Sequence, residues 1–198
     1  SLGGTLRIIT NEPVLGEFQG KVDTSYSGTK SGANSSNTNM MLNVPLGDTM
    51  ALRMVAYNKR DGGFIDYTHA RVNEKNANEI DTNGGRVALA YEPTDDLKVN
   101  ASYIYQESNI DGKSWFNPGT DLEIDAPVKD QQLDKTSIYN LTLDYNFGDF
   151  SIYSSSTYFN GDNDWVFEYS ENAYLALKPI YDFSGIPAIS PHHFNEEF

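Results

Sequence analysis

Three acidic side chains alternate along the chain at Asp121, Glu123 and Asp125. In an extended segment this spacing places all three carboxylates on one side, and carboxylate oxygens are ligands that suit Ca²⁺. The segment lacks the glycine-containing twelve-residue pattern of an EF-hand loop. We therefore interpret these charges as the solvated surface of an exposed loop and expect no resident metal.

Groups suited to catalysis are few. The chain has three histidines, of which His192 and His193 are adjacent; neighbouring residues of a strand point to opposite faces, so we interpret this pair as surface residues in a loop and not as ligands of one ion. The absence of cysteine excludes disulfides, thiol catalysis and cysteine-based zinc sites. No G-x-S-x-G elbow, P-loop or G-x-G-x-x-G motif is present. We therefore predict that the protein is not an enzyme and needs no cofactor.

The 198 residues include 14 basic and 28 acidic side chains, which gives a formal net charge of -14. A chain this acidic could not neutralise a row of phosphates, which argues against a nucleic-acid partner. Its longest unbroken apolar runs are five residues, at 87–91 and 173–177, whereas a membrane-spanning helix needs about 20. A β-barrel crosses the bilayer with alternating strands and needs no such run, so this pattern leaves a membrane location open.

Almost every apolar segment alternates with period two, which predicts strands with one apolar and one polar face. The segments with clear alternation are 18–26, 39–44, 86–91, 97–106 and 139–145, and 50–58 and 150–159 are expected to be strands whose faces are harder to assign. Only residues 169–178 offer a weak helix candidate. Strands of about 9 to 13 residues exceed the usual five or six and match the roughly 9 to 11 of a tilted membrane strand. Aromatic residues gather towards their ends, as in the aromatic girdles of membrane barrels.

The connections between these strands alternate in length. Those at 46–49, 92–96 and 148–149 are short, that at 27–35 is moderate, and those at 59–80, 109–134 and 160–192 are long. In an up-and-down meander all short turns then lie at one end, as in outer-membrane barrels. The last two long connections carry more than half of the net negative charge. We therefore predict an all-β, antiparallel up-and-down meander that is part of a transmembrane β-barrel, with structureless, solvated long loops.

The start of the chain carries a family resemblance. Gly-Gly-Thr-Leu-Arg-Ile-Ile-Thr-Asn-Glu-Pro at residues 3–13 resembles the end of the plug domain in TonB-dependent outer-membrane receptors. Later segments are similar to that family's first barrel strands in the same order. They are Gly-Glu-Phe-Gln-Gly at 16–20, Asn-Val-Pro-Leu at 43–46 with Ala-Leu-Arg at 51–53, Gly-Gly-Phe-Ile-Asp at 62–66 and Phe-Asn-Glu-Glu-Phe at 194–198.

The resemblance implies two domains, the C-terminal end of a plug at 1–13 and the N-terminal part of a 22-stranded barrel at 14–198, with about seven strands and the start of an eighth. Both ends of the sequence lack start or stop features, so we expect a fragment. It implies active uptake of a scarce, bulky ligand such as a ferric siderophore across the bacterial outer membrane. Its implied partners are outer-membrane lipid and the TonB energy-coupling complex, which would act through a missing N-terminal region.

Candidate site residues fall into two groups. The plug segment contributes Gly3, Gly4, Thr5, Arg7, Ile9 and Thr10; its glycines would permit close backbone approach, residues 6–9 would form a short buried strand, and Arg7 could pair with carboxylates of the barrel wall or be solvated. The polar faces of the strands supply candidates for the barrel lumen, most of them solvated wall residues. These are Lys21, Asp23, Asn39, Asn43, Arg86, Lys98, Asn100, Asn140 and Asp144.

Two alternatives remain open. A passive porin-like barrel would share the strands and loops but lack the segment at 3–13. A soluble β-sandwich could bind carbohydrate through Trp115, Tyr67 or Trp165, with its apolar faces against a second sheet. For the fragment itself we expect a curved open sheet with two unpaired edges, which would need lipid, detergent or self-association.

Overall fold

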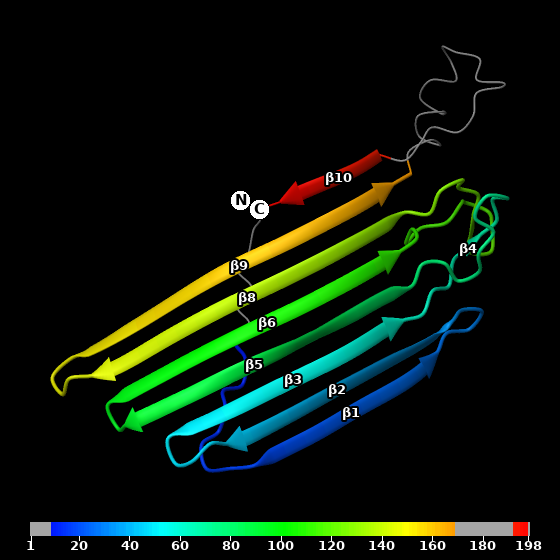
Figure 1. Cartoon of the computed structure of the whole chain (residues 1–198). Coiled ribbons are helices and arrows are strands. Elements are labelled where there is room, and N and C mark those ends of the chain that lie inside the picture. Colours follow the sequence, from blue (N-terminus) through cyan, green and yellow to red (C-terminus); the bar gives the residue numbers. More distant parts are fainter. Residues whose placement is uncertain (1–8, 169–191, 198) are drawn as a thin grey trace.

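The computed structural model describes residues 9–168 and 192–197, and these fold into one long sheet with a small packed region at one end (Figure 1). The described residues contain strands and no helix. The helix candidate at 169–178 lies outside them. The strands are β1 (Gln19–Gly28), β2 (Asn34–Pro45), β3 (Met50–Asp61), β4 (Asp66–Tyr67), β5 (Ile80–Thr94), β6 (Leu97–Asp111), β7 (Glu123–Ile124), β8 (Gln131–Asn146), β9 (Ser151–Phe167) and β10 (His192–Glu197).

The main sheet is an antiparallel up-and-down meander, as the alternation predicts. Its strand order is β1-β2-β3-β5-β6-β8-β9-β10, so that each strand pairs with the next one along the chain once β4 and β7 are set aside. Seven of these strands have 10 to 17 residues and β10 has six. Within the described residues β1 and β10 form two edges and the sheet does not close on itself.

Tight turns lie at one end of the sheet and long connections at the other (Figure 1). Two of the three turns are closed by backbone bonds, from Leu46 N to Met50 O and from Phe147 N to Phe150 O, both 2.8 Å. Each contains a glycine at positive φ, Gly47 and Gly148, where other residues would be strained. The opposite end holds the connections at 62–79 and 112–130.

The strands extend further towards the long connections than the apolar alternation indicates. β9 continues to Phe167 and β8 begins at Gln131, so residues assigned above to loops belong to the ladder. Polar side chains such as Asp134 and Lys135, which point to opposite faces, occupy both faces there, and their backbones still pair with β9. The apolar pattern is lost in these parts because hydrogen bonding, and not burial, holds the strands together. His192 and His193 likewise belong to β10 and not to a loop, which corrects that expectation.

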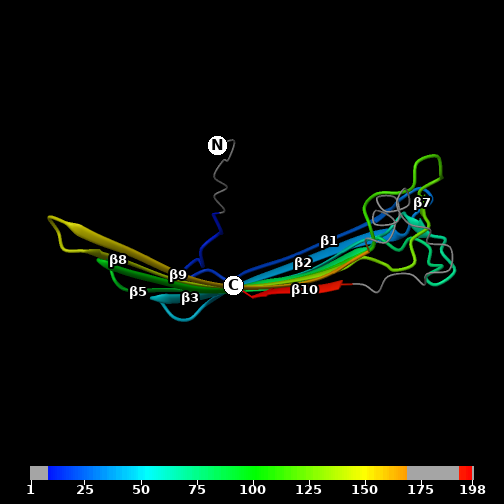
Figure 2. The ribbon, with the colours of Figure 1, turned by 90° about the horizontal axis from the view of Figure 1, so that it is seen from above.

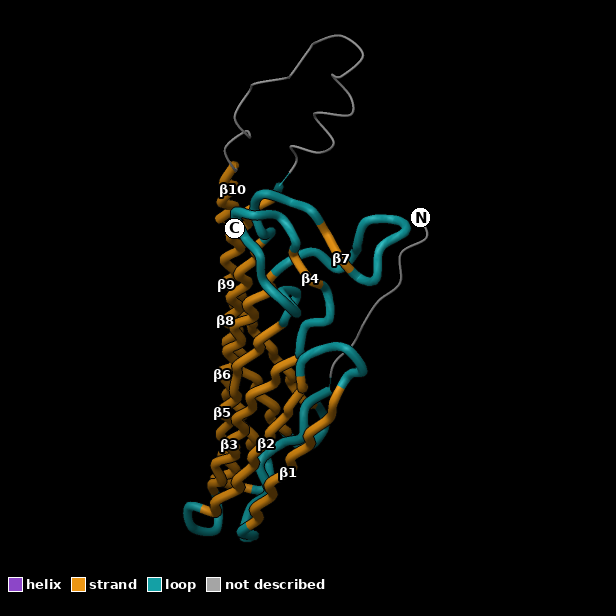
Figure 3. The backbone as a smooth tube through the Cα atoms, turned by 90° about the vertical axis from the view of Figure 1, so that its right-hand side faces the viewer, coloured by secondary structure: helices purple, strands orange, loops and turns teal. Residues whose placement is uncertain are grey.

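The expectation of structureless long loops is wrong for residues 62–79 and 112–130, which we call the cap. β4 and β7 pair in parallel within it, and Ile65, Tyr67, Ala77, Ile124 and Ala126 form a buried apolar cluster. Side chains hold parts of its backbone. Asn78 Oδ1 accepts hydrogen bonds from Phe64 N at 2.7 Å and Ile65 N at 2.8 Å, and Asp66 Oδ1 accepts one from Asn76 N at 2.8 Å. Figure 3 shows the cap folded over one side of the sheet.

Candidate functional site

The two faces of the sheet differ in their surroundings. The ends of the strands bend towards the side on which the chain before β1 lies (Figure 2), and the cap lies on that same side (Figure 3). We call this the inner face and the opposite one the outer face. The candidate wall residues of β1, β2, β5, β6 and β8 all lie on the inner face, because cross-strand partners in a register share a face. One row that shows this runs Gln19, Asn43, Arg53, Ala88, Ser102, Asn140 and Thr157.

The outer face carries an exposed apolar band. Residues such as Met40, Val87 and Leu141 are between 44% and 52% exposed, which is unusual for large apolar side chains gathered on one surface. Two groups of aromatic side chains border the band. Tyr91, Tyr145, Phe147 and Phe150 lie near the tight turns, and Tyr103, Tyr105, Tyr139 and Tyr158 lie further along the strands.

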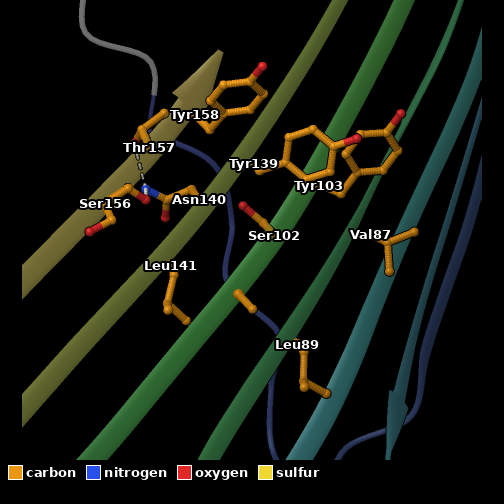
Figure 4. A pocket seen from close by; sticks show the side chains of 11 residues that line it. Val87, Leu89, Ser102, Tyr103, Tyr139, Asn140, Leu141, Ser156, Thr157 and Tyr158 are labelled. Carbon is orange, nitrogen blue, oxygen red and sulfur yellow. Dashed lines mark hydrogen bonds between the residues drawn. The ribbon is translucent and has the colours of Figure 1, made fainter. Parts of the chain in front are cut away.

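A shallow hollow of about 520 Å³ opens on this outer face. Tyr103, Tyr139 and Tyr158 form a row along one side of it, and Leu89 and Leu141 lie opposite (Figure 4). Ring centroids are 4.7 Å apart for the first tyrosine pair and 6.1 Å for the second. The hollow lies over the small residues Ala101 and Ser156, which stand in the same cross-strand row as Leu89 and Leu141, beside the row of tyrosines.

Asn43 fixes the chain before β1 to the inner face. Its side chain is fully buried, and Nδ2 donates to Val14 O at 2.9 Å and to Glu17 O at 2.7 Å, while Oδ1 accepts from Val14 N at 2.9 Å. Three bonds from one amide therefore hold a turn whose own backbone has no strand partner. Pro13 is also buried there.

Two arginines lie beside this anchor on the inner face. Arg53 is the direct cross-strand neighbour of Asn43 and is 9% exposed. Arg86 lies one register step away on β5, opposite Val55, and its Nη1 donates to Asn11 O at 2.7 Å. The structure thus brings together Asn43 and Arg86 from the predicted wall residues and adds Arg53, which the sequence reading did not select.

The other predicted wall residues make ordinary surface contacts. Lys21 and Asp23 form an exposed ion pair at 3.2 Å, and Lys98 pairs with Glu92 at 3.3 Å. Asn140 Nδ2 donates to Thr157 Oγ1 at 2.8 Å. Asp144 lines a hollow beside the tight turns, together with Asp96 and Asp149. Such exposed contacts are typical of solvated side chains, and the assignment of these residues to a barrel wall stays a prediction.

The plug-segment candidates are only partly described. Gly3, Gly4, Thr5 and Arg7 lie outside the described residues. Ile9 and Thr10 are exposed and belong to no strand, and Ile9 has 77% of its surface exposed. The prediction of a short buried strand is therefore wrong at Ile9, since no strand of the described chain pairs with this segment.

The cap contains a buried charge cluster around Lys113. Lys113 Nζ lies 3.5 Å from Glu168 Oε2, 3.8 Å from Asp130 Oδ1 and 4.7 Å from the ring centroid of Trp115. The Lys113 and Glu168 side chains are 4% and 3% exposed. Glu168 N also donates to Asp130 Oδ1 at 2.9 Å. The cluster joins the cap to the end of β9.

Tyr67 is part of this buried region and cannot stack on a sugar, which corrects that alternative. It is 1% exposed, and its hydroxyl oxygen accepts a hydrogen bond from Lys113 N at 3.0 Å. Burial is the main cause that raises the pKa of Tyr67 to about 12.

An alkaline titration should show that the pKa of Tyr67 in the folded protein lies above the ordinary pKa of tyrosine. The unfolded pKa of tyrosine is 10.0, so stability from Tyr67 is complete below pH 10 and is lost as pH rises from 10 to about 12. We expect a tyrosine absorbance step near pH 12 that disappears in Tyr67→Phe but persists in Tyr26→Phe. A titration in which Tyr67→Phe removes only an ordinary step near pH 10 would contradict the burial of this hydroxyl.

Residues 9–168 and 192–197 contain neither a candidate metal site nor a helix that could span a membrane. No group of three or more acidic or histidine side chains there could hold a metal ion, and Asp121, Glu123 and Asp125 therefore form no such cluster. No helix in this part of the chain is long and apolar enough to cross a membrane.

The sequence did not reveal two features of the structure, namely the buried Arg53 and the cluster of Lys113 with Asp130 and Glu168. A signal for Arg53 existed, because an arginine alternates with Met50, Leu52 and Met54. Nothing local marks Lys113, whose partners are 17 and 55 residues away. Comparisons with protein-family models, with curated proteins and with solved structures found no match for this chain. Function is therefore inferred from the two faces of the sheet and from what lies on each.

Proposed function

We propose that this chain is part of the wall of an outer-membrane β-barrel that actively takes up a bulky ligand, such as a ferric siderophore, with energy from TonB. In this proposal residues 1–13 end a plug domain and residues 14–198 begin a 22-stranded barrel. The outer face contacts lipid, the inner face lines the lumen, and the protein performs no chemistry on its cargo.

The apolar band with its two aromatic borders is the observation that carries the membrane part of the proposal. On β6 the outer-face residues from Leu97 to Tyr105 span about 27 Å along the strand at ~3.4 Å per residue. A tilt of about 40° reduces this to roughly 21 Å of thickness, close to the ~25 Å apolar belt of membrane barrels. Beyond the band, outer-face positions are polar, as in Asn109 and Asp111. The height of the band and its polar margin are therefore what the lipid-facing wall of such a barrel would need.

The two ends of the sheet differ in a way that favours one orientation across the membrane. Membrane barrels have short periplasmic turns and long extracellular loops, so the cap would lie outside the cell and the Asn43 anchor at the periplasmic end. The chain before β1 crosses the inner face at that end, held by Asn43 and Arg86. A segment bound inside the wall favours a plugged transporter over a passive porin. A soluble sandwich would need a second sheet on the outer face, and the described residues include none there.

These 198 residues contain no cysteine, so single thiols introduced here test the two faces. Leu89→Cys and Leu141→Cys place a thiol on the outer face. Ser102→Cys places one on the inner face, next along the chain to Ala101, which pairs with both leucines. Each variant of the native protein is labelled with an environment-sensitive fluorophore in membranes that contain nitroxide lipid. We expect strong quenching at positions 89 and 141 and little at 102. Equal, weak quenching at all three positions would exclude the membrane assignment.

Transport is tested separately in cells. A bacterium that carries the native protein should take up one member of a panel of ferric siderophores, and uptake should stop when either this protein or TonB is removed. Uptake that persists without TonB would favour the porin alternative. If no siderophore is taken up while the quenching pattern holds, the barrel assignment stands and the cargo assignment fails.

A further inference from the structure

Among the described residues, the guanidinium groups of Arg53 and Arg86 have no counter-ion. Neither makes an ion pair with any carboxylate of the described residues, whose eight ion pairs involve other groups. The two arginines are diagonal neighbours on one face of β3 and β5, and their charges are close enough to repel each other. Arg53 is buried and Arg86 is half-buried, and like charges partly removed from water are costly unless an anion completes the site.

The hydrogen bonds of the pair are also incomplete. A guanidinium group offers five N–H donors. Arg53 uses Nη1 in one long bond of 3.4 Å to Gln19 Oε1, and Arg86 uses Nη1 in its bond to Asn11 O. Arg86 Nε is buried and has no hydrogen-bond partner. Several donors therefore remain for an acceptor that the described chain does not supply.

Small residues flank the two arginines on the inner face. Ala51, Ala88 and Ala90 lie on the inner face next to the arginines in the register and are at most 3% exposed. Glu12 attracts Arg86 but lies beyond ion-pair distance, and its side chain is exposed. Residues 1–8 contain no acidic side chain.

We propose that Arg53 and Arg86 form an anion site that binds a carboxylate at the tight-turn end of the inner face. Two adjacent guanidinium groups suit the paired oxygens of a carboxylate, which each can bind through two parallel hydrogen bonds. The carboxylate has two possible sources, a free organic acid or an acidic side chain of a protein segment that covers the inner face in the native protein. This site does not depend on the proposed transport activity.

The test compares loss of charge with retention of charge in the native protein, purified in detergent. R53M/R86M keeps the apolar stems and removes both charges, R53K/R86K keeps the charges, and R60M is the matched control. Arg60 is exposed and pairs with Glu79 at 2.6 Å on the outer face of the same strand as Arg53. Thermal unfolding is measured with and without citrate, at constant ionic strength.

A free organic acid as occupant predicts that citrate raises the unfolding midpoint of the wild type and of R60M by about 5 °C and leaves R53M/R86M unchanged. A carboxylate of the native protein as occupant predicts no citrate effect, a lowered midpoint in R53M/R86M and recovery in R53K/R86K. The proposal is overturned if citrate acts alike on all variants and R53M/R86M is as stable as the wild type or more stable. It is also overturned if R53M/R86M is destabilised, citrate has no effect and the lysine variant does not recover, because packing would then explain both arginines.

Discussion

Replacing Asn43 with alanine is expected to release residues 11–17 from the inner face of the sheet. The change removes one donor group and one acceptor that serve three backbone atoms of Val14 and Glu17. Each net hydrogen bond is worth about 1 kcal/mol, and buried partners left unpaired add to the loss. We expect the free energy of opening this segment to fall by about 3 kcal/mol, which is roughly a hundredfold in the opening equilibrium.

Hydrogen exchange at the Val14 amide measures this opening directly, because that amide donates to Asn43 Oδ1. Asn39→Ala is the matched control. Asn39 lies on the same strand and face, and its side chain makes no hydrogen bond to a described residue. Asn43→Asp should be at least as damaging as alanine, because a carboxylate would face the carbonyls of Val14 and Glu17. Unchanged protection of Val14 in Asn43→Ala would show that Pro13 and Arg86 suffice to hold the segment.

The meander could be predicted from the sequence because the apolar alternation indicates the strands and the connection lengths indicate how they follow one another. Each strand with a clear period-two pattern is a strand in the structure, and the same pattern places the wall residues on one face. The two faces of the strand at 50–58 were hard to assign from the sequence because Val55 and Tyr57 are apolar residues on the inner face. Alternation fails as a guide where both faces carry apolar side chains.

The anchor and the cap could not be predicted because they depend on contacts between distant residues. Asn43 reads as one more polar residue of a strand, and only the register and the path of residues 11–17 reveal its burial. The cap follows from side chains that replace backbone partners, as Asn78 does for Phe64 and Ile65. Such bonds leave no periodic signal, so a packed region reads as a polar loop.

Lys113→Met is expected to cause the largest loss of cap stability. The methionine keeps most of the apolar stem but leaves Asp130 and Glu168 without the buried cation that lies 3.8 Å and 3.5 Å from their oxygens. Removing one partner of a buried ion pair costs about 3–5 kcal/mol, because the remaining charge stays desolvated. The cap should therefore open before the sheet unfolds. Hydrogen exchange at the amides of Asp66 and Tyr67, which bond to Leu122 O and Glu74 O within the cap, should show this.

Lys59→Met is the matched control for this loss. Lys59 forms an ion pair with Asp61 at 2.6 Å, but the two side chains are 51% and 44% exposed, so the change should cost less than about 1 kcal/mol.

The pH dependence of cap opening in Lys113→Met distinguishes the contribution of the lysine charge from that of its packing. Burial is the main cause that raises the pKa of Asp130 above its ordinary 3.8, and loss of the lysine should raise it further. A carboxyl group with a raised folded pKa stabilises the fold when protonated, and that stability is lost as pH rises through the folded pKa. The cap of Lys113→Met should therefore be better protected near pH 5 than near pH 8, and Asp130→Asn in the same chain should flatten this dependence. An opening that is equal at both pH values would mean that Lys113 holds the cap through packing against Trp115 and not through its charge.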